Sequence, residues 1–337
     1  MPSLPPFRLD PVLVAKPWGG RRLAEFGKPL PAQDMIGESW EVADLPAAPG
    51  SAVADPRSRV SGGPLAGVAL CDLIDRFGAA LLGSANPTPD GGFPLLVKFL
   101  DAREHLSVQV HPHAEYVERH PDARLKTESW YVIDAVPGAE LFLDIAGGTS
   151  IEEFRAALGT PAVVDMLRRV PATAGDFHHL PAGLLHALGA GVLVAEVQTP
   201  SDTTFRIYDW NDEYGRPVRD LHLAEAAETL VASPEGAISS GRMEGPGVRP
   251  LIVTEHYWMR EHVSGGGTVA LVDLPETRVL MVTRGGVTVD GTPARAGTTV
   301  VVPAVAAART VVTADDGAGM LEVGLTPVEP AALAAAG

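Results

Sequence analysis

The sequence predicts a mainly β fold made of two β-rich units with a few short helices. Short Val-rich runs recur along the 337 residues, and 36 Gly and 30 Pro separate them. Gly and Pro are the residues that turns between short strands require. A polar, Gly-rich stretch at 233–248 divides the runs into two groups. With 46% hydrophobic and 20% charged residues, the chain has enough apolar material for a packed core.

The first unit, residues 1–232, is expected to start with extended chain and then to form one helix over 65–83. Apolar residues recur there at helical spacing, and Gly83 marks the expected end. Strands are predicted next, over 93–102, 106–112, 128–136, 139–146, 176–181 and 191–200.

Two further segments of the first unit are expected to be helical. A short helical insert is predicted around 150–169, where Ser150 and Glu153 match a capping box, and another helix over 220–232. Residues 233–248 then form a linker. The second unit, 249–330, alternates short β-rich runs with turns, as small β-barrels and sandwiches do.

Charge and cysteine content restrict the classes of partner and the cellular compartment. A formal net charge of −16 argues against nucleic acid and against an anionic membrane, because both require a basic face. The single cysteine, Cys71, excludes an intrachain disulfide and fits a reducing compartment. The first residues lack the apolar core of a signal peptide, and no apolar run approaches the ~20 residues of a membrane span. We expect a cytoplasmic protein, monomer or homodimer, with a small-molecule partner.

A spaced set of turn residues leads to one histidine. Gly175, Pro181, Gly183 and His186 match the pattern G-x5-P-x-G-x2-H, which is the second motif of cupin barrels. Pro and Gly build the turn between two strands, and the turn directs His186 into the mouth of the barrel. The two units are therefore expected to be cupin-like β-barrel (jelly-roll) domains, with His186 as a metal ligand.

The stretch LSVQVHPHAEYVERH, residues 106–120, contains too many candidate ligands for one metal ion. The generic first cupin motif would select His111, His113 and Glu118. A different set combines Gln109 and His111 with a later glutamate, Glu128. Gln109 and His111 lie two apart on a strand, so their side chains share one face. The residues by themselves leave both sets open.

Several longer stretches are similar to the short bacterial form of the type I mannose-6-phosphate isomerases. They are KPWGG, GESWEVAD, FPLLVKFLDA, SVQVHP, KTESWYVI, LPAGLLHALG and VQTPSDTTFRIYDW, spread over residues 16–222. The resemblance implies one zinc ion per chain, held by Gln109, His111, Glu128 and His186. His113 and His120 are then expected to lie outside the metal site.

The same resemblance implies an aldose–ketose isomerase that interconverts mannose 6-phosphate and fructose 6-phosphate through a cis-enediol. Arg206 is expected to stabilise the enediolate. Asp202 either carries the proton or orients Arg206. Lys126 lies two before Glu128 and is expected to be a cation of the site.

Three further residues are candidates for substrate binding: Trp18, Lys98 and Ser107. The resemblance suggests that Trp18 forms a wall of the pocket. Lys98 interrupts an apolar run, where it serves either the site or a structural ion pair. Ser107 shares the face of Gln109 and either contacts phosphate or is an ordinary strand serine.

Two other classes of function remain open. The first is another metal-dependent cupin enzyme, such as an oxygenase, which would use the set containing His113. The second is a non-catalytic sugar-binding cupin, which would not need Asp202 and Arg206. In the second unit, His256 and His262 are expected to be structural, so no second metal is expected there.

Overall fold

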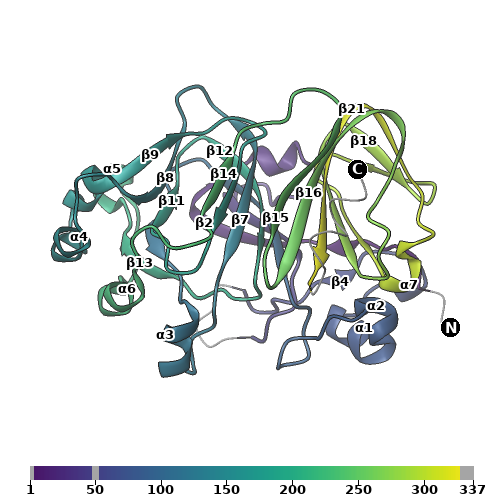
Figure 1. The fold of residues 1–337 in the computed structure, drawn as a ribbon, viewed down its shortest axis with the longest axis horizontal. Helices are drawn as coiled ribbons and strands as arrows, with labels where there is room; N and C mark the ends of the chain where they lie inside the picture. The colour runs from purple at the N-terminus through teal and green to yellow at the C-terminus, as the bar shows by residue number, and fades with distance from the viewer. Residues whose placement is uncertain (1–3, 48–52, 327–337) are drawn as a thin grey trace.

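Strands dominate the computed structural model, which describes residues 4–47 and 53–326 (Figure 1). All pairings between these strands are antiparallel, and the expected mainly β class is confirmed. In chain order the strands are β1 (Leu9–Asp10), β2 (Val12–Gly20), β3 (Ile36–Val42), β4 (Arg59–Val60), β5 (Leu96–Ala102), β6 (Val108–Val110), β7 (Glu128–Ala135), β8 (Glu140–Ile145), β9 (Leu167–Pro171), β10 (Phe177–Leu180), β11 (His186–Leu188), β12 (Val192–Gln198), β13 (Phe205–Tyr208), β14 (Ile238–Ser240), β15 (Gly247–Val253), β16 (Tyr257–Val269), β17 (Arg278–Arg284), β18 (Gly286–Val289), β19 (Thr292–Arg295), β20 (Thr299–Val302) and β21 (Val312–Leu325).

The helices are short. They are α1 (Leu70–Phe77), α2 (Ala79–Leu82), α3 (Ala114–Arg119), α4 (Ile151–Ala157), α5 (Asn211–Tyr214), α6 (Leu223–Thr229) and α7 (Ala304–Ala307), with 3-10 helices η1 (Arg22–Ala24), η2 (Gly63–Leu65) and η3 (Pro161–Met166). None of the helices in the described residues has the length and apolar character that a membrane crossing demands.

The three larger sheets lie one behind another along the long axis of the molecule (Figure 1), and β1 and β4 form a separate two-stranded sheet. A central seven-stranded sheet has the order β14-β10-β7-β12-β5-β2-β3, and a five-stranded sheet has the order β13-β6-β11-β8-β9. The C-terminal sheet runs β15-β16-β21-β17-β20, with the hairpin β18–β19 attached to β21. The strand orders of the described residues are open, and none closes into a barrel.

The central sheet is covered on both faces. One face packs with the five-stranded sheet in a cluster that includes Trp18, Trp130 and Leu188. The other face meets the C-terminal sheet in the largest cluster, where Phe99 and Phe177 pack with residues of β16, β17 and β21. All residues of β5 and β12 are buried as a result, which is why LVKFLDA and VLVAEVQ read as nearly continuous apolar runs.

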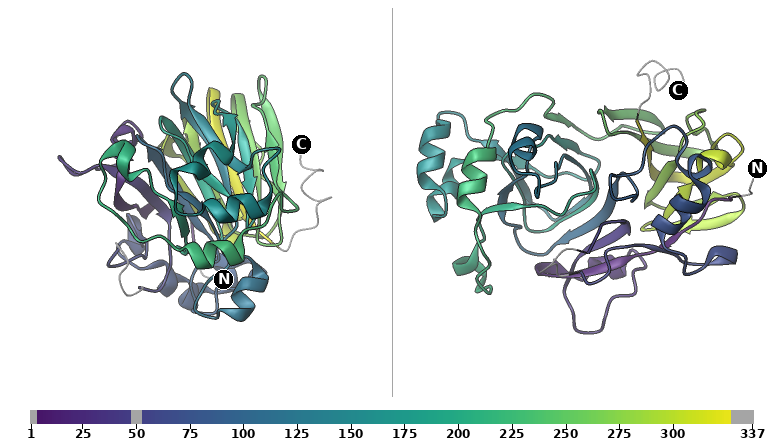
Figure 2. Two further views of the ribbon diagram at one scale, coloured as in Figure 1. Left: turned by 90° about the vertical axis from the view of Figure 1, so that its left-hand side faces the viewer. Right: turned by 90° about the horizontal axis from the view of Figure 1, so that it is seen from below.

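Helices cover the outer face of the five-stranded sheet (Figure 2). Residues of α4, η3 and α6 pack on it, among them Phe154, Val163 and Ala226. The capping box at the start of α4 is confirmed, because Ser150 and Glu153 bond each other's backbone N–H. Figure 2 shows these helices and the C-terminal sheet at opposite ends of the molecule.

Three predictions about segments need correction. The single helix expected over 65–83 is split into α1 and α2 at Gly78, whose φ of 45° interrupts the helical path. The stretch 233–248 is not entirely irregular, because it contains β14, which pairs with β10 at the edge of the central sheet, and because β15 already begins at Gly247. The expected helical insert is present over 151–166, but residues 167–169 already belong to β9.

Candidate metal centre and active site

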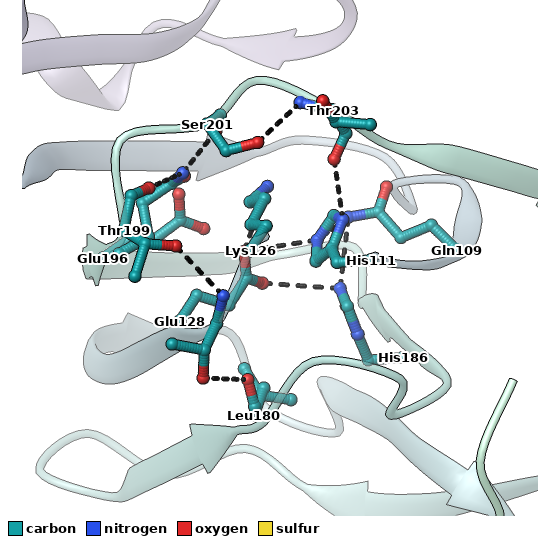
Figure 3. Close-up of polar contacts among 12 residues, drawn as sticks. Gln109, His111, Lys126, Glu128, Leu180, His186, Glu196, Thr199, Ser201 and Thr203 are labelled. Atoms are coloured by element: carbon teal, nitrogen blue, oxygen red, sulfur yellow. Dashed lines mark hydrogen bonds and ion pairs between the residues drawn. The ribbon is translucent and has the colours of Figure 1, made fainter. Parts of the chain in front are cut away.

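The four predicted ligands come from two facing sheets and meet in the interior between them (Figure 3). Glu128 begins β7 in the central sheet. Gln109 and His186 are directly opposite residues of β6 and β11 in the five-stranded sheet. His111 follows the end of β6, two residues after Gln109. The structure therefore brings all four side chains together.

A tight turn connects two of these ligands. Gly183 has a φ of +86°, which favours glycine, and an added Cβ would lie 3.0 Å from Val231. Its backbone N–H donates to the carbonyl oxygen of His111 over 2.9 Å. The turn that carries His186 is thus bonded directly to the backbone of a second ligand, as the Gly/Pro spacing of the sequence suggests.

The ring nitrogens and the carboxylate face one point. Nε2 of His111 lies 3.3 Å from Oε2 of Glu128, and Nε2 of His186 lies 3.4 Å from Oε1 of Glu128. Nε2 of Gln109 lies 3.4 Å from Nε2 of His111 and 3.2 Å from Nε2 of His186. The ligand atoms of the two histidines and the glutamate all lie within 4.8 Å of one another.

Backbone carbonyls settle which ring nitrogen carries the proton. Nδ1 of His111 lies 3.1 Å from the carbonyl oxygen of Thr203, and Nδ1 of His186 lies 2.9 Å from that of Leu184. A carbonyl only accepts, so each Nδ1 must donate, and in a neutral ring Nε2 is left with a bare lone pair. Burial lowers the pKa of both histidines, that of His111 to about 3, so both rings are neutral.

The carboxylate between them is ionised. Burial opposes the charge of Glu128, but the Lys126 ammonium holds its pKa well below the usual range. Neither of its oxygens has a hydrogen bond of good geometry within the described residues, although Nζ of Lys126 lies 3.1 Å from Oε2. Two imidazole lone pairs, both within reach of the Gln109 amide nitrogen, face a buried carboxylate, and a cation between them would relieve their repulsion. The donor set therefore fits a divalent metal.

A second group of buried charges lies beside the ligands. Nζ of Lys98 is 3.3 Å from a carboxylate oxygen of Glu38 and 3.3 Å from one of Glu196. Burial opposes the charge of Lys98, but these carboxylates, and less strongly Asp202 and Glu128, raise its pKa. Lys98 and Glu196 are directly opposite on β5 and β12, so both point into the same interior as Glu128.

The sequence reasoning missed Glu196. It interrupts the apolar run VLVAEVQ in the same way that Lys98 interrupts its own run. A buried acid in such a run needs a partner, and that signal was available. Glu196 also accepts a hydrogen bond of 2.9 Å from the indole of Trp130, whose ring lies edge-on to His186. Burial and the Glu128 carboxylate raise the pKa of Glu196.

Gln198 is a second residue that the sequence reasoning missed. Its amide donates to the carbonyl oxygens of Thr199 and Ser201. These bonds hold the loop after β12, which supplies the Thr203 carbonyl to His111. No local pattern distinguishes such a glutamine from any other strand residue.

The three predicted substrate-binding residues, Trp18, Lys98 and Ser107, are all buried. The hydroxyl of Ser107 donates to Oε1 of Gln109 over 3.1 Å, as the strand parity suggests. Trp18 is buried in the apolar cluster that also contains Trp130. Lys98 is buried with its carboxylate partners.

Arg206 and Asp202 occupy the edge of the site. Arg206 lies opposite Gln109 in the β13–β6 pairing, and its guanidinium donates to the carbonyl oxygen of Asp220 over 2.7 Å. Its Nε is buried without a hydrogen-bond partner among the described residues, and burial lowers its pKa. Asp202 is exposed in the loop after β12. The charges that act most on Arg206 are Arg219, Asp209 and Asp220, whereas Asp202 acts on Lys98.

The remaining histidines of the first cluster lie apart from the four ligands. His113 caps α3, where its Nδ1 accepts from the backbone N–H of Tyr116 over 3.3 Å. His120 is 43% exposed in its side chain and pairs with Glu228.

Comparison with known proteins identifies the family. Residues 6–135 match the model described as phosphomannose isomerase type I, catalytic domain. A probable mannose-6-phosphate isomerase of Bacillus subtilis (strain 168), GmuF, is 39% identical over 253 residues, or 74% of this chain and 75% of that protein.

Solved structures agree with the sequence comparison. The crystal structure of mannose 6-phosphate isomerase from Bacillus subtilis aligns with a TM-score of 0.78 and 28% identity, over 95% of this chain and 99% of that one. A mannose 6-phosphate isomerase bound with zinc and yttrium shares the fold, with a TM-score of 0.71 and 17% identity over 96% and 100% of the two chains. The chain belongs to the type I phosphomannose isomerase family.

Proposed function

We propose that this protein is a metal-dependent aldose–ketose isomerase that interconverts mannose 6-phosphate and fructose 6-phosphate. The observation that carries the proposal is the geometry around Glu128. Two neutral imidazoles direct unprotonated Nε2 atoms at an ionised, buried carboxylate, in a chain of the phosphomannose isomerase family. The small-molecule substrate is a sugar phosphate.

The metal of this site is proposed to be zinc, one ion per chain, held by Gln109, His111, Glu128 and His186. Neutral histidines with one carboxylate and one amide oxygen form a donor set of the kind that zinc accepts. The amide of Gln109 now directs Oε1 to the Ser107 hydroxyl. Since a hydroxyl accepts as well as it donates, the reversed amide keeps that contact and turns Oε1 toward the cluster. Bound there, zinc would supply Lewis acidity to the sugar oxygens.

The chain's own groups are proposed to handle the charge and the proton. A proton must move between C2 and C1 of the sugar, and negative charge develops on O1 and O2 on the way. Lys126, 3.1 Å from Glu128, provides a fixed cation at the ligands. Arg206 provides another at the edge, and its unpartnered Nε leaves a donor for the developing oxyanion.

Asp202 is proposed as the proton carrier. It is exposed, so it can exchange protons with solvent, and its carboxylate acts on Lys98 rather than on Arg206. This favours a shuttle over a residue that orients Arg206. Lys98 and Ser107 are proposed to bind substrate oxygens, and Trp18 to support the wall of the pocket next to Trp130.

We also propose that the chain comprises two cupin-like units, 1–232 and 249–330, with the metal in the first only and 233–248 between them. The fold shared with mannose 6-phosphate isomerase supports a cupin-type architecture. Residues 327–330 lie outside the described part of the chain. Limited proteolysis is expected to cut near the exposed Arg242 and Glu244 and to leave two fragments that remain associated through their common core.

A coupled assay with mannose 6-phosphate tests the function. The zinc-loaded protein is expected to form fructose 6-phosphate, and EDTA is expected to abolish turnover. Arg206→Ala should retain its zinc and lose about 10²–10³-fold in kcat, as enzymes do when one oxyanion donor is removed. Light scattering on the same sample distinguishes monomer from homodimer.

Absence of turnover by protein that carries one zinc per chain would contradict the proposed function. Turnover that survives complete removal of metal would contradict the metal's role.

A further inference from the structure

An unusual pair of residues lies beside the strand that carries His186, because one of the two belongs to the neighbouring strand β8. In the described residues, four non-glycine residues have a left-handed backbone, and two of them, Asp144 (φ 76°) and Ser233 (φ 46°), are bonded to each other. This conformation costs free energy in an L-residue, so it persists only where the surroundings impose it. The two residues are far apart in sequence, at the end of β8 and after α6.

Both carboxylate oxygens of Asp144 have hydrogen-bond donors. The Ser233 hydroxyl donates to Oδ2 over 2.8 Å, and the Ser233 backbone N–H lies 3.4 Å from Oδ1. Oδ1 also accepts the backbone N–H of Ile145 over 2.7 Å. Asp144 is 7% exposed, whereas Ser233 is exposed. The serine therefore closes the site of the carboxylate from the solvent side.

The backbone of Asp144 is bonded to the turn that carries the ligand. Its N–H donates to the carbonyl oxygen of Leu185 over 2.7 Å. Leu185 directly precedes His186, and the carbonyl of Leu184 accepts from Nδ1 of His186 over 2.9 Å. The left-handed turn at Asp144 is thus one residue away from the contact that orients the imidazole.

The segment after α6 holds the same turn at a second point. The backbone N–H of Val231 donates to the carbonyl oxygen of Gly183 over 3.0 Å. On its other side, the N–H of Gly183 donates to the carbonyl of His111. The segment 231–233 therefore contacts the ligand turn twice, once directly at Gly183 and once through Asp144.

We propose that Asp144 and Ser233 are positioning residues for the metal centre, forming a clamp that fixes the direction of the His186 ring. The clamp acts through the Leu184–Leu185 backbone and touches neither metal nor substrate. The proposal rests on the metal site inferred above. Outer partners of this kind commonly change metal affinity by about 10–100-fold when they are removed.

Co²⁺ is the probe, because its absorption spectrum reports the arrangement of its ligands and its titration gives an affinity. Ser233→Ala removes the hydroxyl at an exposed position, and Asp144→Gly removes the carboxylate while keeping a residue that tolerates positive φ. Each variant is expected to bind Co²⁺ about 10-fold or more weakly than the unmodified protein, with an altered visible spectrum. Asp144→Asn keeps an acceptor and suits a left-handed backbone, so it should recover most of the affinity.

The chain offers a matched control. Asp290 is also left-handed (φ 44°), and its Oδ1 accepts a backbone N–H from Val311 over 2.8 Å, but it lies in the turn between β18 and β19, far from the ligands in sequence. Asp290→Gly is expected to leave the Co²⁺ affinity and spectrum unchanged. Thermal unfolding of the metal-free forms separates loss of affinity from loss of folding. If Asp144→Gly does not fold, Ser233→Ala carries the test.

The outcomes distinguish the clamp from the metal site. Unchanged affinity and spectrum in Ser233→Ala and in folded Asp144→Gly, with normal binding by the unmodified protein, would overturn the clamp alone. An equal loss in Asp290→Gly would also overturn it, because the effect would then be global. Failure of the unmodified protein to bind Co²⁺ would overturn the metal site and the clamp together.

Discussion

Two buried glutamates, one on each side of the central sheet, have similar neighbours and opposite chemistry. In the C-terminal sheet, Glu322 accepts from Arg260 over 2.7 Å and from Nε2 of His262 over 2.9 Å, and Nε of Arg278 lies 3.2 Å away. Its other oxygen also accepts a backbone N–H from Val272. Every direction around this carboxylate contains a proton donor, so the cluster is closed on itself.

Glu128 has two histidines and one lysine around it, but the histidines donate elsewhere. Their Nδ1 protons are directed to the carbonyls of Thr203 and Leu184, whereas His262 directs its Nε2 at the carboxylate. Nδ1 of His262 is buried without a hydrogen-bond partner among the described residues. The ring nitrogen that faces the carboxylate therefore decides the chemistry. A ring that donates to the carboxylate completes an internal ion cluster, whereas a ring whose proton is held by a backbone carbonyl leaves a lone pair for a cation.

The largest effect is expected from a change in the open cluster, which is Glu128 with His111, His186 and Lys126. Glu128→Gln removes the only ionised oxygen among the proposed ligands, so zinc affinity should fall by more than about 100-fold, beyond the loss of an outer partner. Activity should fall by about 10³-fold or more, because the metal contributes several kcal/mol to the transition state. Metal analysis and the coupled assay measure both. Glu118→Gln, in the alternative ligand set, is the control, and equal losses in the two variants would contradict the proposed ligands.

A change in the closed cluster, which is Glu322 with Arg260, His262 and Arg278, should lower the stability of the fold and leave metal binding unchanged. Glu322→Gln removes the buried carboxylate that pairs with Arg260 and Arg278, and the expected loss is about 3–5 kcal/mol in the free energy of unfolding. Urea denaturation measures it. The folded fraction should still contain one zinc per chain; a loss of zinc with unchanged stability would refute the contrast between the two clusters.

Replacement of Lys126, the cation of the open cluster, is expected to have an intermediate effect. Lys126→Met is expected to lower kcat by about 10²-fold, while zinc affinity stays equal or rises, since a positive charge near the metal disappears. Titration with a competing chelator and steady-state kinetics report the two quantities separately. A fall in zinc affinity would mean that Lys126 serves mainly to organise Glu128.

The smallest effect is expected at His113, which the generic cupin motif would place on the metal. His113→Ala should cost about 1 kcal/mol through loss of the cap of α3. Zinc content and kcat should not change. Thermal unfolding and metal analysis test this, and loss of zinc would favour the oxygenase-like ligand set over the proposed one.

Local patterns in the sequence were sufficient to predict the turn and the strand faces that carry part of the site. The spacing from Gly175 to His186 predicted a turn and a directed histidine, and strand parity placed Ser107, Gln109 and His111 on one face. The same kind of signal predicted the capping box at Ser150. These features depend on backbone geometry over a few residues, which the sequence specifies directly.

The choice between the two ligand sets needed more than local patterns. Spacing by itself admitted His113 and Glu118 as readily as Gln109 and Glu128, and the family resemblance favoured the second set. Glu128 joins His111 only because two sheets face each other, which no spacing within one segment encodes.

Other features were decided by the tertiary structure alone. The partners of Lys98, the ring nitrogen that each histidine exposes and the bond between Asp144 and Ser233 all join residues far apart in the chain. The physical reason is common to these cases. A buried charge or a strained backbone is stable only with a particular partner, and the pairing of distant strands determines which partner is within reach.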